Sequence, residues 1–214
     1  EMDTFTGRVH GLVDRNRIFI DRMRDVGVIS TADAVNWGFT GPLLRSTGAA
    51  RDLRKDTAYL AYAELDFEVP VGIKGDNYDR YYVRMREIDE SAHMVRQLME
   101  MLPAGPLCVD DRRCTFPEKS LVYTEIESLI NHFKLVMDGP QVPPGEVYSA
   151  HEGANGELGF YIVSVGGGVP WKVHCRSPSF VHMGGVHRML DGYQLADIVP
   201  TFGSVNMIGG ECDR

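Results

Sequence analysis

The residues near the carboxyl end of the chain have the types needed for close contact with a ligand or a neighbouring chain. The stretch from Gly203 to Arg214 reads GSVNMIGGECDR, in which small and apolar residues precede charged ones. Gly209 and Gly210 would let a ligand or a neighbouring chain approach the backbone closely, with the Glu211 and Arg214 side chains behind them. The alternative is a tail that frays in water, as many chain ends do. The residues alone leave both interpretations open.

Basic side chains also gather in the glycine-containing stretch TGPLLRSTGAARDLRK, where they are Arg45, Arg51, Arg54 and Lys55. They could bind an anion or an acidic partner. Equally, the arginines could hold the loop through hydrogen bonds to its own backbone carbonyls. Further along, charges recur at helical neighbour spacing, at Arg80, Arg84, Glu87 and Glu90. That spacing is typical of a salt-bridged helix face that is solvated or lies at an interface.

Other candidate chemistry is weaker. The VGGGV stretch (165–169) lacks the Lys-Ser/Thr of a phosphate-binding loop and precedes a strand, so a hairpin turn is expected. Four possible ligands lie close in sequence, at His174, Cys175, His182 and His187, but their spacing matches no established zinc pattern. Cys108 and Cys114 are too few for an iron–sulfur cluster. The sequence therefore predicts neither a metal site nor a catalytic residue.

Composition narrows the class of protein. The 214 residues are 43% hydrophobic and 24% charged, which indicates a folded chain. A formal net charge of -8 argues against nucleic acid and anionic lipid as partners. The four cysteines form no CxxC pair, which suits a reducing compartment, and no apolar run is long enough to span a bilayer. Because the chain starts at Glu1 within an apparent helix, a fragment of a longer protein is expected.

Helical signals dominate the first part of the chain. Apolar residues at helical spacing predict a helix over residues 3–24, which Gly27 ends. Ser30 should cap a short second helix, with Asp33 at its third position. The basic stretch 40–55 shows little periodicity and is expected to be a loop.

Two longer helices should follow. Asp76 or Asn77 is placed to cap the first, which should end at Pro103. One side of that helix is expected to carry Tyr81, Ile88, Val95, Leu98 and Leu102. The second is amphipathic and is expected over residues 118–137.

The pattern changes after Pro144, where short β-rich runs alternate with NG and GGG turns and predict an antiparallel meander. Short helices are expected around 187–190 and 194–199. The predicted fold class is therefore α+β. A mainly helical body should span residues 1–140, and the β meander with the carboxy-terminal tail should span 141–214.

Several longer strings in this sequence resemble one known family. They are GFTGPLLRSTGAARDLRK (38–55), DFEVPVGIKGDNYDRYYVRMREIDES (66–91), GEVYSAHEGANGELGFYIVS (145–164), RSPSF (176–180) and LADIVPTFGSVNMIGGECDR (195–214). In this order they cover nearly the whole chain. They resemble the carboxy-terminal half of the D subunit (49-kDa type) of respiratory NADH:quinone oxidoreductase, complex I.

The resemblance implies a fold like that of the [NiFe]-hydrogenase large subunit, from which this family has lost the metal centre. It implies a quinone-pocket subunit that receives electrons from a [4Fe–4S] cluster in the adjacent B subunit, in a reaction coupled to proton translocation. The chain itself would bind no cofactor, with quinone as the substrate. The family's principal headgroup contacts, a His and a Tyr, belong to an amino-terminal region absent here, so this fragment alone should be inactive.

The resemblance carries particular residues onto this sequence. The family tail enters the quinone pocket, and here the matching pocket residues are Asn206, Ile208, Glu211 and Arg214. Asn206 stands where the family usually has Asp, which keeps a hydrogen-bonding side chain and removes a charge. Arg45 and Arg51 are expected to tune the neighbouring cluster or to contact another subunit.

Partners and location also follow from the resemblance. The expected partners are other peripheral-arm subunits of complex I, especially B and C, together with quinone. The expected location is peripheral, on the cytoplasmic face of the bacterial inner membrane or on the matrix side in mitochondria. Two alternatives remain: a hydrogenase-type large subunit, which would carry cysteine pairs near both ends, and a non-catalytic scaffold paralogue.

Overall fold

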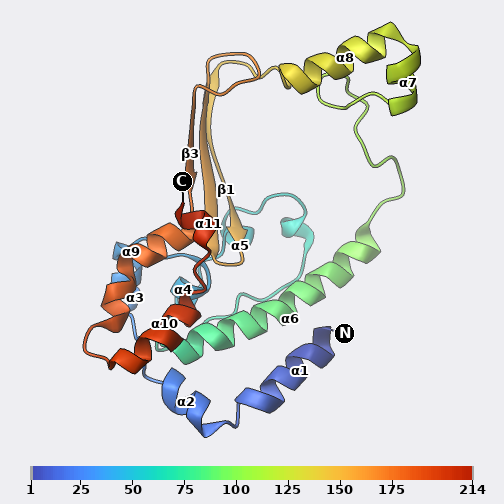
Figure 1. The fold of residues 1–214 in the computed structure, drawn as a ribbon. Helices are drawn as coiled ribbons and strands as arrows, with labels where there is room; N and C mark the ends of the chain where they lie inside the picture. The colour runs from blue at the N-terminus through green and yellow to red at the C-terminus, as the bar shows by residue number, and fades with distance from the viewer. Residues whose placement is uncertain (1, 214) are drawn as a thin grey trace. The chain divides into compact units, whose positions relative to one another are not determined.

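The computed structural model describes residues 2–213, apart from the side chain of Asp3. Contacts group the chain into two units. The first comprises residues 1–101, 150–159 and 176–214, and the second comprises 102–149 and 160–175. The division into residues 1–140 and 141–214 that the sequence pattern suggests stays a prediction. The mixture of many helices with one small sheet confirms the predicted α+β class (Figure 1).

The expected first helix is broken in two. Helix α1 spans Met2–Val13 and α2 spans Arg17–Met23. Between them the side-chain oxygen of Asn16 accepts hydrogen bonds from the backbone N–H groups of Ile18 and Phe19, at 3.0 and 3.3 Å. Asn side chains compete with the helix for backbone donors, so this position starts a new helix in place of continuing the first.

The next segment departs from the prediction of a loop. After α3 (Thr31–Asn36), which Ser30 caps as expected, come α4 (Gly41–Arg45) and α5 (Leu53–Asp56). Pro42 lies in the first turn of α4, where its fixed backbone angle favours a helix. All five residues of α4 are buried. Helix α4 is therefore part of the interior, whereas α5 buries only Leu53.

The main core of the first unit forms around α4. Its buried members are Ile29, Ala34, Phe39, Leu43, Leu44, Met189 and Val205. Each fully buried large side chain of this kind contributes about 1.5–3 kcal/mol relative to exposure. Because Met189 and Val205 come from the end of the sequence, this core fixes the carboxy-terminal helices against α3 and α4. A smaller cluster of Leu65, Phe67 and Met94 lies elsewhere in the unit.

The long helix α6 spans Asn77–Met101, and its start and end agree with the prediction. The Asp76 carboxylate accepts the backbone N–H of Asp79 at 2.8 Å and so caps the helix. The expected apolar side is not the buried one, since its members Val95, Leu98 and Leu102 are exposed. The buried residues of α6 are Asn77, Arg80, Val83, Met85 and Met94.

Strands β1 (Gly145–Gly153), β2 (Gly156–Ser164) and β3 (Lys172–Arg176) form the predicted meander, in the order β1-β2-β3. The β1–β2 turn lies against the start of α4. A Cβ on Gly41, whose φ is +64°, would stand 2.7 Å from the Asn155 carbonyl oxygen and closer still to the Gly156 Cα. Glycine is therefore required for this close approach. The VGGGV stretch lies between β2 and β3, as expected for a turn.

Four helices complete the first unit: α9 (Pro178–Leu190), the 3-10 helix η2 (Leu195–Asp197), α10 (Ile198–Val205) and α11 (Gly209–Cys212). Helix α9 is longer than the short helix expected at its carboxyl end. Helix α10 packs against α6 and α9, and α11 packs against α9 (Figure 1). The tail is therefore structured through most of its length.

The second unit holds α7 (Lys119–Thr124) and α8 (Ile126–Met137), which pack together. A single helix was expected here, but Glu125 adopts an extended backbone between the two. Apolar residues on α8 are exposed within the described structure, namely Ile126, Leu129, Ile130, Phe133 and Val136. No helix of residues 2–213 is both long enough and apolar enough to cross a bilayer.

Candidate functional site

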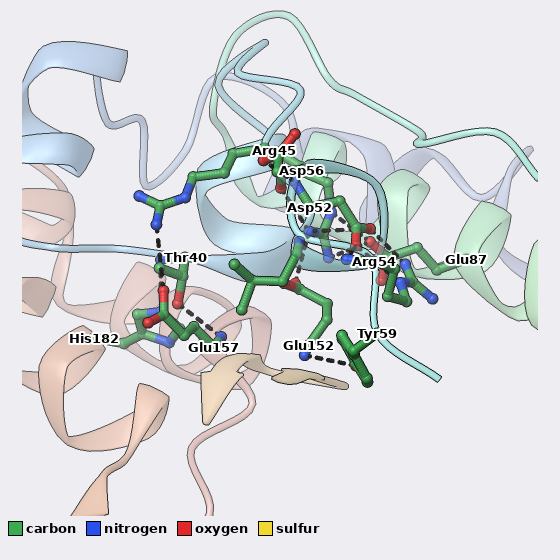
Figure 2. A network of polar contacts seen from close by, with 12 residues as sticks. Thr40, Arg45, Asp52, Arg54, Asp56, Tyr59, Glu87, Glu152, Glu157 and His182 are labelled. Carbon is green, nitrogen blue, oxygen red and sulfur yellow. Dashed lines mark hydrogen bonds and ion pairs between the residues drawn. The ribbon is translucent and has the colours of Figure 1, made fainter. Parts of the chain in front are cut away.

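Arg45 lies at the centre of a buried charge network in the first unit (Figure 2). Its Nε donates to Glu87 Oε1 at 2.8 Å, and its Nη1 donates to Glu152 Oε1 at 2.8 Å. Nη1 also donates to the Arg51 carbonyl at 2.9 Å and lies 3.6 Å from Asp52 Oδ2. With 1% of its side chain exposed, Arg45 has its guanidinium occupied from within the chain.

Burial and charge compete in this network. Burial acts to lower the pKa of Arg45, but the nearby carboxylates of Glu87, Glu152 and Asp52 reverse this and leave the pKa raised. Burial likewise acts to raise the pKa of Asp52, yet its hydrogen bonds to Arg54 and the charge of Arg45 leave it lowered. For Glu87, burial prevails and the pKa is raised despite Arg45. Asp52 is thus stabilised as an anion more strongly than Glu87.

Glu152 joins the β1 strand to the stretch around α5. Its second carboxylate oxygen accepts the Leu53 N–H at 3.3 Å, and its own backbone N–H donates to the Tyr59 hydroxyl at 3.1 Å. Arg54 pairs with Asp52 at 2.6 Å and lies over the ring of Phe67. The basic stretch is therefore held by carboxylates as well as by a carbonyl, a combination that the sequence did not indicate.

A second buried guanidinium, that of Arg80 on α6, has neutral partners. It donates to the carbonyls of Gly75 and Gly27 at 2.8 and 2.7 Å, to Asn77 Oδ1 at 2.5 Å and to Ser204 Oγ at 2.9 Å. Burial, together with the charge of Arg84, lowers its pKa to about 9. The expectation of a solvated or interfacial face is wrong for this residue, because Arg80 is fully buried and ties α6 to α10.

Arg84, one turn further along α6, caps the carboxyl end of α10. Its Nη1 donates to the Ser204 carbonyl at 2.7 Å, and its Nη2 donates to the Val205 carbonyl at 3.3 Å. A cation at this end of a helix also opposes the negative end of the helix dipole. Burial lowers the pKa of Arg84 to about 10, so it stays charged at neutral pH.

Helix α10 ends at its C-cap residue, Asn206. Asn206 has a left-handed backbone with φ +55°, a conformation that Asn tolerates better than most residues. Its side-chain Nδ2 donates to Asn155 Oδ1 at 2.9 Å, and Asn155 Nδ2 donates to the Asn206 carbonyl at 3.0 Å. The β1–β2 turn is therefore joined to the first residue of the tail by two hydrogen bonds.

The tail is then attached to the start of α9. The Glu211 carboxylate accepts the Ser179 N–H at 3.0 Å, and the Glu211 carbonyl accepts the Ser177 hydroxyl at 2.5 Å. The Ile208 N–H donates to the Ser179 hydroxyl at 3.3 Å. A carboxylate at the first turn of a helix satisfies backbone donors that lack partners within the helix.

Two cavities lie beside Arg84 and Asn206, and both residues line each of them. One, of about 450 Å³, is also lined by Arg45, Glu87 and Glu152. The other, of about 500 Å³, has a more apolar lining that includes Met23, Tyr81, Met85, Ile88 and Pro200. The first cavity is therefore bordered by both the charge network and Asn206, and the second by apolar side chains and Asn206.

The structure locates most of the residues predicted from the sequence. Asn206 lines both cavities, while Ile208 and Glu211 are attached to α9 as described. Arg214 lies outside the described residues. Arg45 is central to the charge network, whereas Arg51 is 55% exposed and pairs with Glu157 at 3.5 Å. Their expected roles toward quinone and a neighbouring cluster stay predictions.

Two of the histidines considered as metal ligands, His182 and His187, have other contacts. His182 is buried, and burial lowers its pKa to about 3, with a further contribution from Arg176. Its Nε2 accepts the Thr40 N–H at 3.4 Å. His187 packs edge-on against Trp37. Within residues 2–213, no three His, Cys, Asp or Glu side chains are grouped so that they could hold a metal.

Sequence reasoning missed Asp52, Glu152 and Asn155 as residues of this site, and it gave Arg84 no role here. Arg84 was noticed only as part of a charged helix face. Glu152 and Asn155 lie in strings used for the family resemblance, but nothing in their spacing linked them to Arg45 or to Asn206. Their partners are 107 and 51 residues away, respectively. The one local signal was the Asn155–Gly156 pair, which correctly predicted the turn.

Comparison with known proteins identifies the family. All of residues 1–214 match the family described as respiratory-chain NADH dehydrogenase, 49 Kd subunit. A relative from Pelobacter propionicus, named as the D subunit of NADH-quinone oxidoreductase, is 69% identical over 212 residues, which are 99% of this chain and 53% of that protein. The proteins of the same name from Myxococcus xanthus and Geobacter sulfurreducens are 52% and 44% identical over 206 and 216 residues.

Those alignments cover 96% and 100% of this chain and 50% and 55% of the two relatives, respectively. The chain thus spans about half the length of the curated relatives that it matches. The resemblance found in the sequence strings is confirmed. On the match along its whole length, the chain belongs to the family of the 49-kDa subunit of respiratory-chain NADH dehydrogenase.

Proposed function

We propose that this chain is part of the quinone-reducing subunit of a proton-translocating NADH:quinone oxidoreductase. The observation that carries the proposal is the family match along all 214 residues, together with relatives named as the D subunit of NADH-quinone oxidoreductase. In this proposal the chain binds no cofactor of its own. Electrons reach quinone from a [4Fe–4S] cluster in the adjacent B subunit, and the C subunit is another neighbour.

Within the complete protein, the tail that begins at Asn206 would form one wall of the quinone cavity. Asn206 and Ile208 would face the quinone, with Arg214 contributing beyond them. Such a cavity needs apolar surface for the ring and a few polar groups near the reduced oxygens. Support comes from the tail's hydrogen bonds to Asn155 and α9, and from Arg84 on the end of α10 before it, since a wall must keep its position to bind a ligand.

Glu211 has a different place in this proposal from the one implied by resemblance. Its carboxylate accepts the Ser179 N–H, so part of its hydrogen-bonding capacity is already used at the start of α9. We therefore assign Glu211 to holding the wall. Arg45 and Arg51 would act on the neighbouring cluster or subunit. The assembled protein would lie peripherally on the cytoplasmic face of the bacterial inner membrane.

The test uses the full-length subunit assembled in its complex. Ile208→Ala removes apolar surface from the proposed wall and should raise the quinone KM about tenfold, the effect of roughly 1–2 kcal/mol of lost apolar contact. NADH oxidation by hexacyanoferrate, an acceptor that bypasses quinone, should not change. Val199→Ala, at a 77% exposed position on α10, is the matched control. An unchanged quinone KM in Ile208→Ala would refute the proposed wall.

A further inference from the structure

The β1–β2 turn, which contacts the residue that starts the tail, is itself held by several close contacts. Asn155 is 2% exposed although it lies in a turn. The turn is held by the Glu157 N–H, which donates to Thr40 Oγ1 at 3.0 Å, and by the close approach of Gly41 and Gly156. The Asn155 side chain therefore projects from a backbone with little freedom to shift.

Thr40 is itself fixed from a second direction. Arg176, at the end of β3, donates from Nη1 to Thr40 Oγ1 at 3.0 Å and to the Glu157 carbonyl at 2.5 Å, and from Nη2 to the Gly38 carbonyl at 2.8 Å. One guanidinium thus ties the turn to the segment before α4. The turn is consequently part of the same rigid assembly as the core around α4.

Asn206, the first residue of the tail, needs such a support. Asn206 holds a left-handed backbone, which costs a residue with a Cβ about 1–2 kcal/mol unless local bonds stabilise it. The Asn155 carboxamide both donates to the Asn206 carbonyl and accepts from the Asn206 side chain. A carboxamide can do both at once because it carries a donor and an acceptor side by side. The pair therefore fixes the direction in which the chain leaves α10.

We propose that Asn155 is a positioning residue for the quinone-facing tail: the reciprocal Asn155–Asn206 pair, with Arg84 on the end of α10, sets where residues 207–212 begin. The bonds of Ile208 and Glu211 to α9 hold them further along. This inference rests on the proposed function. Asn155 acts through Asn206 and need not contact the quinone. Loss of the pair should leave α10 in place, since Arg80 and Arg84 still hold it, and should loosen the residues that follow.

Two variants of the full-length subunit, tested within its assembled complex, remove different numbers of these hydrogen bonds. Asn155→Ala removes both hydrogen bonds. Asn206→Gly removes the side-chain bond and keeps the left-handed backbone and the carbonyl that accepts from Asn155, while it adds backbone freedom at this position. Asn36→Ala, at an exposed position on α3, is the control. The first readout is amide hydrogen exchange of residues 207–212, and the second is the quinone KM against kcat.

Asn155→Ala should speed exchange of the tail amides about tenfold and Asn206→Gly about threefold, as expected for the loss of two bonds and of one. The amides of α10 and the control should be unchanged. The quinone KM of Asn155→Ala should rise several-fold, with kcat less affected. If Asn155→Ala fails to assemble, exchange in Asn206→Gly decides alone. Unchanged tail exchange in an assembled variant overturns the inference.

The two proposals can fail separately. If the tail loosens in Asn155→Ala while the quinone KM stays the same, Asn155 does not position the tail for quinone. If Ile208→Ala still raises the quinone KM in that case, the wall stands and only the role of Asn155 is refuted. If Ile208→Ala also leaves the KM unchanged, the proposed function of the tail is refuted as well.

Discussion

Arg45 and Arg80 are both buried guanidinium groups in the same unit, yet they are compensated in opposite ways. Arg45 faces three carboxylates, and its pKa is raised. Arg80 faces carbonyl, amide and hydroxyl oxygens, and its pKa falls to about 9. The first arrangement binds three segments through charge, and the second binds α6 to α10 through hydrogen bonds. The stability that each of these two buried arginines contributes should therefore depend on pH in a different way.

The largest effect should come from Arg45→Met. Glu87, Glu152 and Asp52 would lose their shared cation, and the free energy of unfolding should fall by about 3–5 kcal/mol near pH 7. The loss should shrink as the pH falls toward 4, because protonation of Glu87, whose pKa burial already raises, removes part of the repulsion between the carboxylates. Urea unfolding of the full-length protein at both pH values measures this. Arg17→Met, at an exposed position, is the control, and a pH-independent loss would contradict the account.

Arg80→Met should have the next largest effect, a loss of about 2–4 kcal/mol, because buried acceptors at Gly27, Gly75 and Ser204 would lose their donor. This loss should be the same at pH 7 and pH 5, since none of those partners titrates there and Arg80 itself stays charged below its pKa of about 9. The same urea measurement applies. A loss that varies with pH as strongly as that of Arg45→Met would remove the proposed difference between the two sites.

These two arginines also show which features of the fold could not be predicted from the sequence. Ser30, the limits of α6 and the three-stranded meander were predictable, because caps, a helix-ending proline and turn pairs act over a few residues. The burial of Arg80 and of the stretch around Arg45 was not, since it depends on partners far along the chain. A charged residue at helical spacing is usually solvated, and only the fold supplies the carbonyls or carboxylates that permit burial.

The tail likewise has some features that could be predicted from the sequence and others that depend on distant partners. The family pattern identified the segment, and Asn at position 206 suits the left-handed turn found there. Its pairing with Asn155 joins residues 51 positions apart and had no local signal. The engagement of Glu211 with the start of α9 likewise needed the position of Ser179.

Asp52→Asn should have a smaller effect, about 1–2 kcal/mol at pH 7. Burial acts to raise the pKa of Asp52, but Arg54 and Arg45 leave it lowered, so the ionised group contributes stability above its ordinary pKa. That contribution is lost as the pH falls through the lowered pKa, and the variant should then match the parent. Asp66→Asn, an exposed position, is the control. A difference that does not shrink as the pH falls below the ordinary pKa of an aspartate would contradict this assignment.

Glu87→Gln should have the smallest effect, within about 1 kcal/mol at pH 7. Burial raises the pKa of Glu87 despite Arg45, so ionisation of this carboxyl costs stability that the amide avoids. The amide oxygen can still accept from Arg45. Thermal unfolding beside Glu100→Gln, an exposed position on the same helix, measures the difference. A loss as large as that of Asp52→Asn would show that Glu87 matters as an anion.

The most direct test of the proposed wall is photolabelling of the assembled complex with a short-chain azidoquinone. Trypsin cleaves after Arg188, and the next basic residue is Arg214, so the tail lies in the single peptide 189–214. The proposal predicts a label on this peptide at residues 206–212, lost when unlabelled quinone competes and reduced in Asn155→Ala. Competed labelling at other sites, with none on peptide 189–214, would contradict it.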